Sequence, residues 1–238
     1  MQEICPVCGS KELKHIDTNK YKCLACDEVF NLQGVSAQEL IAKDIYNQNI
    51  DSIVEVSCVF GDEDSSGTGF CVLDGGYIVT NAHVVIDING KNSKLCESVY
   101  VCKNRSTEYF DAEIVYLDAK NDLALLQVQA NQDFRPVKFA KKIEIGEKLT
   151  VIGNSEGKGL MVFDGIVGDL DRKYKNTSAF VFNSLVTHGC SGGPIFNSRG
   201  ELCGVTVGGS KTNTGINYGI PVDILESFIQ TAKKVKCG

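Results

Sequence analysis

The sequence predicts an all-β protein with two antiparallel barrels and a C-terminal helix, preceded by a small cysteine-rich module and a linker helix. From residue 51 onward, short runs of β-branched and aromatic residues alternate with glycine-rich breaks, and nothing with a helical period interrupts them before Val222. Four cysteines in two closely spaced pairs fall within the first 26 residues. The length of 238 residues and the hydrophobic share of 43% allow two packed barrels and one small module.

The module over residues 1–34 carries a metal-ligand pattern. Two C-x2-C pairs are separated by a spacer of 14 residues. Paired thiolates of this kind form a tetrahedron of soft ligands, which suits Zn²⁺. The pattern resembles a zinc ribbon and predicts one structural zinc ion. Its ligands would be Cys5, Cys8, Cys23 and Cys26. Two disulfides are the less favoured alternative.

Charge and hydropathy disfavour two classes of partner. The chain has 24 basic and 30 acidic side chains and a net charge of −6, whereas nucleic-acid binding needs a basic face. Acidic residues also balance the lysines within the cysteine-rich module. We therefore expect the module to bind a protein partner or to regulate the rest of the protein, and we expect no nucleic-acid partner. No apolar run reaches about 18 residues, so we expect no contact with a membrane.

The segment over residues 35–50 predicts a linker helix. Ser36 and Glu39 have the spacing of a capping box at a helix start. Leu40, Ile41 and Ile45 would then form an apolar stripe. We expect this helix to join the cysteine-rich module to the barrels and to pack on the latter.

The remaining chain, residues 51–238, predicts the barrels and a final helix. The crossing from one barrel to the next is expected near residues 130–145, where the sequence turns polar. Residues 223–234 have the apolar spacing of a helix.

The segment Gly189–Pro194 (GCSGGP) has the composition of a nucleophile loop. Glycines allow the tight turn that points backbone N–H groups at the oxyanion of a tetrahedral intermediate. Ser191 alone is a weak nucleophile and needs a base and an orienting acid. His83 in TNAHVV and Asp122 in NDLALL supply candidates, in the order His, Asp, Ser.

Four segments carry a resemblance to trypsin-like serine proteases of the HtrA/Deg type. They are residues 66–85 (SGTGFCVLDGGYIVTNAHVV), 112–128 (AEIVYLDAKNDLALLQV), 189–205 (GCSGGPIFNSRGELCGV) and 217–229 (NYGIPVDILESFI). The resemblance implies a chymotrypsin-like fold of two six-stranded barrels, with His83 and Asp122 on the first barrel and Ser191 on the second. It implies a serine endopeptidase acting on proteins or peptides through an acyl-enzyme, and the cysteine usage considered below leads us to expect it to be intracellular. The backbone N–H groups of Gly189 and Ser191 would form the oxyanion hole.

By the same resemblance, four residues line the primary substrate pocket: Leu185, Val186, Thr206 and Val207. No Asp or Lys is expected at the base of this pocket, and a charged substrate side chain would be buried without a partner. We therefore expect cleavage after small or medium apolar residues.

Departures from the family pattern leave alternatives open. We expect no PDZ domain after the protease segment, unlike in HtrA/Deg enzymes, and Cys190 stands where zymogen-type relatives place an aspartate. We accordingly expect no activation by N-terminal cleavage. Three alternatives are less favoured. They are cysteine catalysis through Cys190, a catalytically silent peptide-binding protein, and a nucleic-acid-binding ribbon protein with a protease-like appendage.

Cysteine usage bears on the compartment. Seven of the 11 cysteines are scattered, and the N-terminus shows no apolar signal region. We therefore expect a cytoplasmic protein with mostly reduced, buried thiols. A disulfide between Cys58 and Cys71 across a hairpin stays open.

Overall fold

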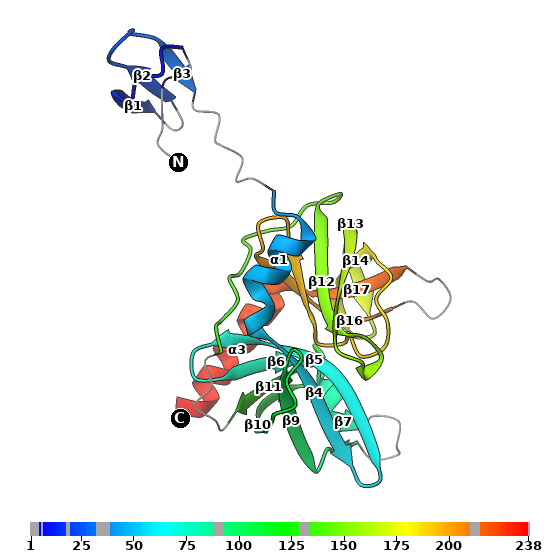
Figure 1. Cartoon of the computed structure of the whole chain (residues 1–238). Coiled ribbons are helices and arrows are strands. Elements are labelled where there is room, and N and C mark those ends of the chain that lie inside the picture. The colour runs from blue at the N-terminus through cyan, green and yellow to red at the C-terminus, as the bar shows by residue number, and fades with distance from the viewer. Residues whose placement is uncertain are drawn as a thin grey trace. The chain divides into compact units, whose positions relative to one another are not determined.

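The structure, a computed structural model, describes residues 5, 7–17, 20–31, 39–87, 93–128, 134–209 and 215–237. The chain divides into two compact units, residues 1–39 and residues 40–238 (Figure 1). In the described ranges, no helix combines the length and the apolar character needed to cross a membrane.

The first unit is a three-stranded antiparallel sheet. It contains β1 (Leu13–Asp17), β2 (Lys20–Cys23) and β3 (Val29–Asn31), in that order. His15 lies opposite Tyr21, and their ring centroids are 4.9 Å apart. Several apolar side chains of this unit are exposed, including Val7 (66%) and Leu24 (57%). So little buried surface cannot stabilise the unit by itself.

The first barrel closes through six strands in the order β10-β11-β6-β5-β4-β9. Their bounds are β4 (Ile53–Phe60), β5 (Glu63–Leu73), β6 (Tyr77–Thr80), β9 (Ser98–Lys103), β10 (Tyr109–Asp118) and β11 (Leu123–Val128). The short helix α2 (Ala82–Val85) follows β6, and the small hairpin of β7 (Ile86–Asp87) and β8 (Lys94–Leu95) follows α2. Alternating β-branched residues of these strands, such as Val54, Val56 and Ile78, form the barrel core.

The second barrel closes in the order β12-β13-β14-β17-β16-β15. Its strands are β12 (Lys148–Asn154), β13 (Leu160–Tyr174), β14 (Thr177–Asn183), β15 (Pro194–Asn197), β16 (Leu202–Gly209) and β17 (Ile216–Pro221). The single-turn segments η1 (Ile50–Ser52) and η2 (Ser155–Gly157) precede β4 and follow β12. Phe180 and Phe182 fill the centre of this barrel with ring centroids 5.9 Å apart. The prediction of an all-β fold with two six-stranded barrels is thus confirmed.

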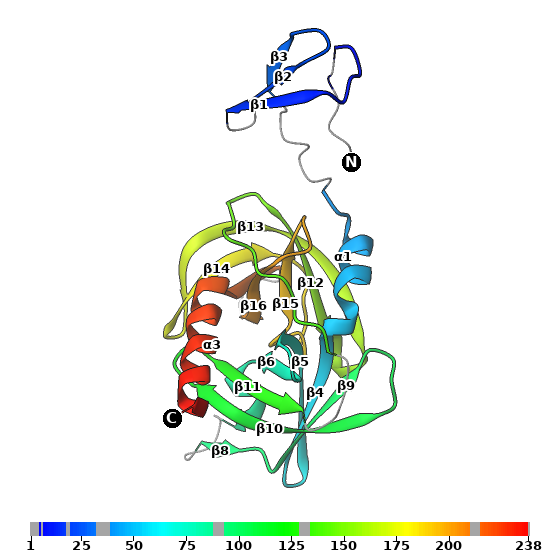
Figure 2. The same ribbon diagram turned by 90° about the vertical axis from the view of Figure 1, so that its left-hand side faces the viewer.

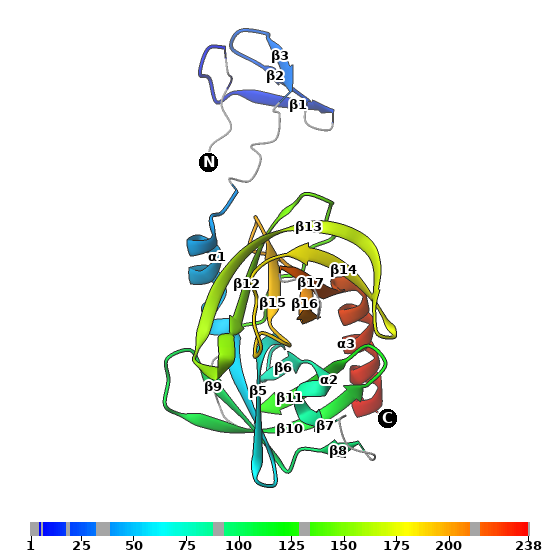
Figure 3. The ribbon, with the colours of Figure 1, turned by 90° about the vertical axis from the view of Figure 1, so that its right-hand side faces the viewer.

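The helix α3 (Val222–Cys237) lies along the seam between the two barrels (Figures 2 and 3). Leu225, Phe228 and Ile229 join one apolar cluster with residues of both barrels. The expected helix over residues 223–234 is confirmed with wider bounds. The crossing between the barrels runs from the end of β11 to the start of β12, in the region that the sequence predicted, although residues 129–133 lie outside the described ranges.

The helix α1 (Ala42–Asn49) corrects the expected helix start. It begins at Ala42 with Ile41 as N-cap, so Glu39 and Leu40 are not helical, and Ser36 lies outside the described residues. The backbone N–H of Leu40 donates instead to the carbonyl of Ser198 at 2.7 Å, which ties that residue to the second barrel. Ile45 is buried, whereas Ile41 is 64% exposed and does not belong to the apolar stripe.

Candidate active site and metal centre

The predicted catalytic residues come from both barrels. His83 lies on α2 of the first barrel, Asp122 in the turn before β11, and Ser191 in the loop before β15 of the second barrel. His83 and Ser191 line one cleft of about 820 Å³, and all four predicted pocket residues line it as well: Leu185, Val186, Thr206 and Val207. The fold therefore brings together side chains that are more than 100 positions apart in the sequence.

The His83–Asp122 pair has the geometry of an oriented base. Asp122 Oδ2 lies 2.7 Å from His83 Nδ1, and Asp122 Oδ1 accepts the backbone N–H of His83 at 2.9 Å. Both contacts fix the imidazole relative to its own backbone. With the proton assigned to Nδ1 by this carboxylate, Nε2 is left as an acceptor.

Asp122 occupies an unusual backbone conformation, with φ of 56°. The side-chain amide of Asn81, which is fully buried, donates to the Asp122 carbonyl at 2.9 Å. The adjacent Asn121 is in turn fixed by the carboxylate of Asp118 at 2.7 Å and by the hydroxyl of Thr177 at 3.0 Å. Such left-handed non-glycine positions persist only where neighbours hold them, and they often occur at functional sites.

The loop that carries Ser191 is anchored to both barrels. The Ser191 carbonyl accepts the N–H of Thr68 on β5 at 2.9 Å, and the N–H of Gly192 donates to Thr206 on β16 at 2.8 Å. Gly192 has φ of 82°, and a Cβ there would collide with the Thr68 carbonyl. The glycine is therefore required by close backbone approach as well as by conformation.

The two N–H groups predicted to bind an oxyanion are free of protein acceptors. Within the described ranges, neither Gly189 nor Ser191 donates its backbone N–H to another residue. Gly189 has φ of 88°, and a Cβ there would meet the Asn154 carbonyl. The Ser191 hydroxyl makes no hydrogen bond to His83 in this structure, and such apo geometry commonly tightens only when substrate binds.

Cys190 is unsuited to act as the nucleophile. Its side chain is fully buried, and burial raises the pKa of its thiol. The reactive form of a cysteine is the thiolate, which this environment disfavours. The structure thus weighs against cysteine catalysis.

The pocket walls are apolar with small polar groups. Thr206 (2% exposed) and Val207 (1%) form buried walls, while Leu185 is 74% exposed at the rim. The carboxylate of Glu156, the acidic group in this lining, is exposed and pairs with Lys158 at 2.7 Å. No Lys, Arg or Asp lines the cleft among the described residues.

Sequence reasoning missed Tyr174 and Asn217, which also line the cleft. Tyr174 lies at the end of β13, and its ring centroid is 5.1 Å from that of Tyr218, with the rings tilted by 39°. Burial, followed by the charge of Asp122, raises the pKa of the Tyr174 hydroxyl. No local motif marks these residues, because strand pairing of β13, β14 and β17 brings them to the site.

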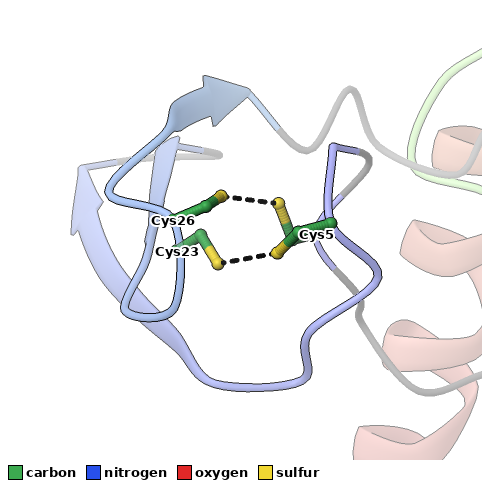
Figure 4. A group of neighbouring side chains, drawn as sticks. Cys5, Cys23 and Cys26 are labelled. Carbon is green, nitrogen blue, oxygen red and sulfur yellow. Dashed lines mark hydrogen bonds between the residues drawn. The ribbon is translucent and has the colours of Figure 1, made fainter.

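The four cysteines of the first unit converge (Figure 4). Their sulfurs all lie within 4.8 Å of one another, with 3.7 Å between Cys5 and Cys26 and 3.6 Å between Cys8 and Cys23. A tetrahedron of sulfurs around a metal at about 2.3 Å has sulfur–sulfur distances of about 3.8 Å. The backbone N–H of Val7 also donates to the Cys5 sulfur at 3.4 Å. The donor set and its spacing therefore fit a tetrahedral metal ion.

Ionisation of these thiols is uneven. Burial opposes ionisation of Cys23, but the backbone N–H groups of Cys26 and Ala25 outweigh it and lower the pKa of Cys23 to about 7. The backbone at Glu28 favours the Cys26 thiolate, but the neighbouring Cys8 thiol and burial prevail and raise the pKa of Cys26 to about 12. Four thiolates this close together repel one another, so they coexist only when a cation lies among them. Binding of a metal ion displaces the protons of the thiols.

The thiols of the second unit are free where described. Cys58 and Cys71 are not bonded to each other. The Cys71 thiol donates to the Leu73 carbonyl at 3.2 Å. The disulfide considered between Cys58 and Cys71 is therefore not formed.

Comparisons with known proteins agree with this geometry. A family model for the trypsin-like peptidase domain matches residues 67–205. A probable periplasmic serine endoprotease, DegP-like, of Rhizobium meliloti is 32% identical over 178 residues, which cover 71% of this chain and 34% of the relative. The periplasmic serine endoprotease DegP of Escherichia coli is 30% identical over 182 residues, covering 72% and 36%. The chain thus spans about a third of the length of these curated relatives.

A solved structure, the serine endoprotease from Yersinia pestis, superposes with a TM-score of 0.70 at 25% identity. The match covers 81% of this chain and 66% of that one.

These relatives correct one expectation. Those from Rhizobium meliloti and Escherichia coli are named periplasmic. The prediction of a cytoplasmic location, which rested on cysteine usage and the N-terminal sequence, is wrong on this comparison. Buried thiols report burial as much as redox compartment, so their number is a weak guide.

The match of the family model over residues 67–205 and the relatives above 30% identity together establish the family to which this chain belongs. This chain belongs to the trypsin-like peptidase family and has HtrA/DegP-type serine endoproteases among its relatives.

Proposed function

We propose that the chain is a serine endopeptidase that cleaves proteins or peptides through Ser191, His83 and Asp122. The observation that carries the proposal is the 2.7 Å contact between His83 Nδ1 and Asp122 Oδ2 at the edge of the cleft that contains Ser191. The names of the relatives, which are serine endoproteases, support the same reaction.

In the proposed reaction, Ser191 Oγ attacks the substrate carbonyl while its proton passes to His83 Nε2. Asp122 stabilises the resulting imidazolium, and the free N–H groups of Gly189 and Ser191 receive the oxyanion. The imidazolium then protonates the leaving amine, and water, deprotonated by His83, releases the acyl group from Ser191.

A fluorophosphonate tests this proposal directly. Intact mass should show one adduct on the wild type and none on Ser191→Ala. Cys190→Ala serves as the matched control and should keep the adduct, because Cys190 is buried. An adduct that survives Ser191→Ala would refute the assignment.

We propose that substrates are cut after small or medium apolar residues. The buried walls of Thr206 and Val207 and the lack of a basic or aspartate side chain in the described lining support this preference. A peptide library should show Val, Ala or Leu enriched before the cut. Dominance of Arg or Glu at that position would contradict it.

A catalytically silent peptide-binding protein is the second candidate. The observation in its favour is that the Ser191 hydroxyl is not hydrogen-bonded to His83. Wild type that fails to react with a fluorophosphonate, yet binds peptides by calorimetry, would favour this alternative.

We propose that residues 1–34 form a zinc ribbon that recruits a protein partner or regulates the peptidase, with residues 35–50 as linker and residues 51–238 as the peptidase domain. The sulfur spacing supports Zn²⁺ held by Cys5, Cys8, Cys23 and Cys26. Metal analysis of the purified chain should give one zinc per molecule, and Cys23→Ser should reduce this content. Zinc content that the variant leaves unchanged would contradict the assignment.

We further propose that the protein works outside the cytoplasm, as the relatives' names indicate. Fractionation of cells that express the native gene should place the protein in the periplasmic or extracellular fraction. Recovery in the cytoplasmic fraction alone would contradict this.

A further inference from the structure

Thr68 on β5 has a hydroxyl that bridges the two barrels beside the candidate oxyanion hole. The residue is fully buried, and its hydroxyl donates to the Gly189 carbonyl at 2.8 Å. The same oxygen accepts the backbone N–H of Asn154 at the end of β12, also at 2.8 Å. A carbonyl only accepts and an amide N–H only donates, so the direction of both bonds is fixed. One side chain of the first barrel therefore holds two segments of the second.

The backbone of Thr68 is itself held on both sides. Its N–H donates to the Ser191 carbonyl at 2.9 Å, and its carbonyl accepts the hydroxyl of Thr80 at 2.7 Å. Thr80 is fully buried on the neighbouring strand β6. The hydroxyl of Thr68 thus starts from a fixed point in the barrel wall.

The peptide groups before and after Gly189 are both engaged. Thr68 holds the carbonyl of the group after it, and the carbonyl of His188, in the group before it, accepts the N–H of Glu156 in η2 at 2.7 Å. In a trans peptide group the C=O and the N–H point in opposite directions. The bond to Glu156 therefore turns the Gly189 N–H away from η2, where it has no acceptor in the described ranges.

The position of η2 depends in turn on Thr68. Asn154, whose N–H the hydroxyl accepts, is the residue directly before η2. Within η2, Glu156 has a left-handed φ of 55°, and Ser155 Oγ lies 2.7 Å from Thr187 Oγ1 in the nucleophile loop. A displaced Asn154 would carry the N–H of Glu156 away from the His188 carbonyl.

We propose that Thr68 is a positioning residue for the oxyanion hole. Its hydroxyl acts on Gly189 directly through the Gly189 carbonyl and indirectly through Asn154 and η2. Thr68 is not among the described residues that line the cleft, so it acts without touching substrate. Donors that are fixed before the reaction stabilise an oxyanion without reorganisation. The inference rests on the proposed function, since the oxyanion arises only when Ser191 attacks a carbonyl.

Two substitutions at one position separate the hydroxyl from the packing of the side chain. Thr68→Val keeps the volume and removes the hydroxyl, and it should lower kcat about 100-fold on a peptide substrate with KM close to that of wild type. Thr68→Ser keeps the hydroxyl and removes the methyl group. It should melt below wild type but keep a kcat close to that of wild type. A role in packing alone predicts the reverse order of kcat.

Hydrogen exchange of the full chain gives a readout that needs no activity. Thr68→Val should speed amide exchange in residues 154–157 and 187–190, while Thr68→Ser and wild type should match there. Strand β14 (Thr177–Asn183) should exchange alike in all three proteins.

Ser155→Ala serves as a second variant should Thr68→Val fold poorly. It removes only the contact of η2 with Thr187, so kcat should fall in the same direction but by less, again without a change in KM. An unchanged kcat in this variant would count against the part of the proposal that runs through η2.

The outcomes distinguish this proposal from the proposed function. Equal kcat in wild type and Thr68→Val, equal losses in Thr68→Val and Thr68→Ser, or unchanged exchange in residues 154–157 and 187–190 would overturn it. A wild type that does not react with a fluorophosphonate would instead refute the peptidase function. The exchange rates would then still decide whether Thr68 holds Gly189 and η2 in place.

Discussion

At the scale of single residues, the site depends on a few polar atoms with defined partners. Asp122 accepts two hydrogen bonds from His83, one from the ring and one from the backbone. This double contact ties the tautomer of the imidazole to the local backbone, so the carboxylate serves orientation as well as charge.

We predict that Asp122→Asn lowers kcat by about 10³- to 10⁴-fold. The amide NH₂ would face His83 Nδ1 and favour the tautomer whose Nε2 carries the proton, which cannot accept from Ser191. Steady-state kinetics on a peptide substrate measures the loss. A melting curve close to that of wild type is the control for folding, and a loss below tenfold would contradict the orienting role.

Gly192 provides a second prediction at this scale. Gly192→Ala should lower the free energy of unfolding by about 3 kcal/mol or more, because its Cβ meets the Thr68 carbonyl. The nucleophile loop would shift, so kcat should fall at least 100-fold.

Gly61→Ala is the matched control, since Gly61 also has a positive φ (68°) but no atom within 4 Å of an added Cβ. It should cost about 1 kcal/mol and leave kcat unchanged. Equal effects of the two substitutions in urea unfolding would show that conformation alone, without the close approach, decides the requirement.

At the scale of elements, α3 and the tip of the β13–β14 hairpin join what the chain builds as two separate barrels. The hairpin brings Thr177 to Asn121 beside Asp122, and α3 inserts Leu225 and Phe228 into the cluster shared by both barrels. These elements fix how the two barrels lie against each other, and the cleft depends on that arrangement.

We predict that Phe228→Ala destabilises the second unit by about 3 to 5 kcal/mol through the cavity it leaves. Phe228 is 3% exposed and its ring lies 5.3 Å from that of Tyr116 on β10. Urea unfolding measures the change. Glu226→Ala on the exposed side of the same helix should stay within about 0.5 kcal/mol, and a similar cost at both positions would contradict the seam argument.

At the scale of the whole molecule, the two units gain stability from different sources. The barrels bury extended apolar clusters, whereas the first unit exposes many of its apolar side chains and has four convergent thiols. Metal binding in such small modules supplies the folding free energy itself.

We predict that a zinc chelator unfolds the first unit and leaves the barrels folded. Hydrogen exchange should lose protection in β1–β3 while β4–β17 keep theirs. Re-addition of Zn²⁺ should restore protection, and Mg²⁺ should not, because thiolates prefer the softer ion. Protection in β1–β3 that persists without metal would contradict a metal-dependent fold.

The sequence by itself determined the features whose chemistry is local in the chain. The spacing of the four cysteines, the glycine-rich loop around Ser191 and the strand-and-glycine pattern predicted the metal ligands, the nucleophile and the all-β fold, because knuckles, turns and strands depend on neighbouring residues. Only the tertiary structure decided the rest. Leu40, just before α1, is hydrogen-bonded to Ser198, Tyr174 reaches the cleft through strand pairing, and Thr177 of the second barrel bonds Asn121 beside Asp122. Each of these joins residues far apart in sequence, and no short-range pattern encodes such contacts.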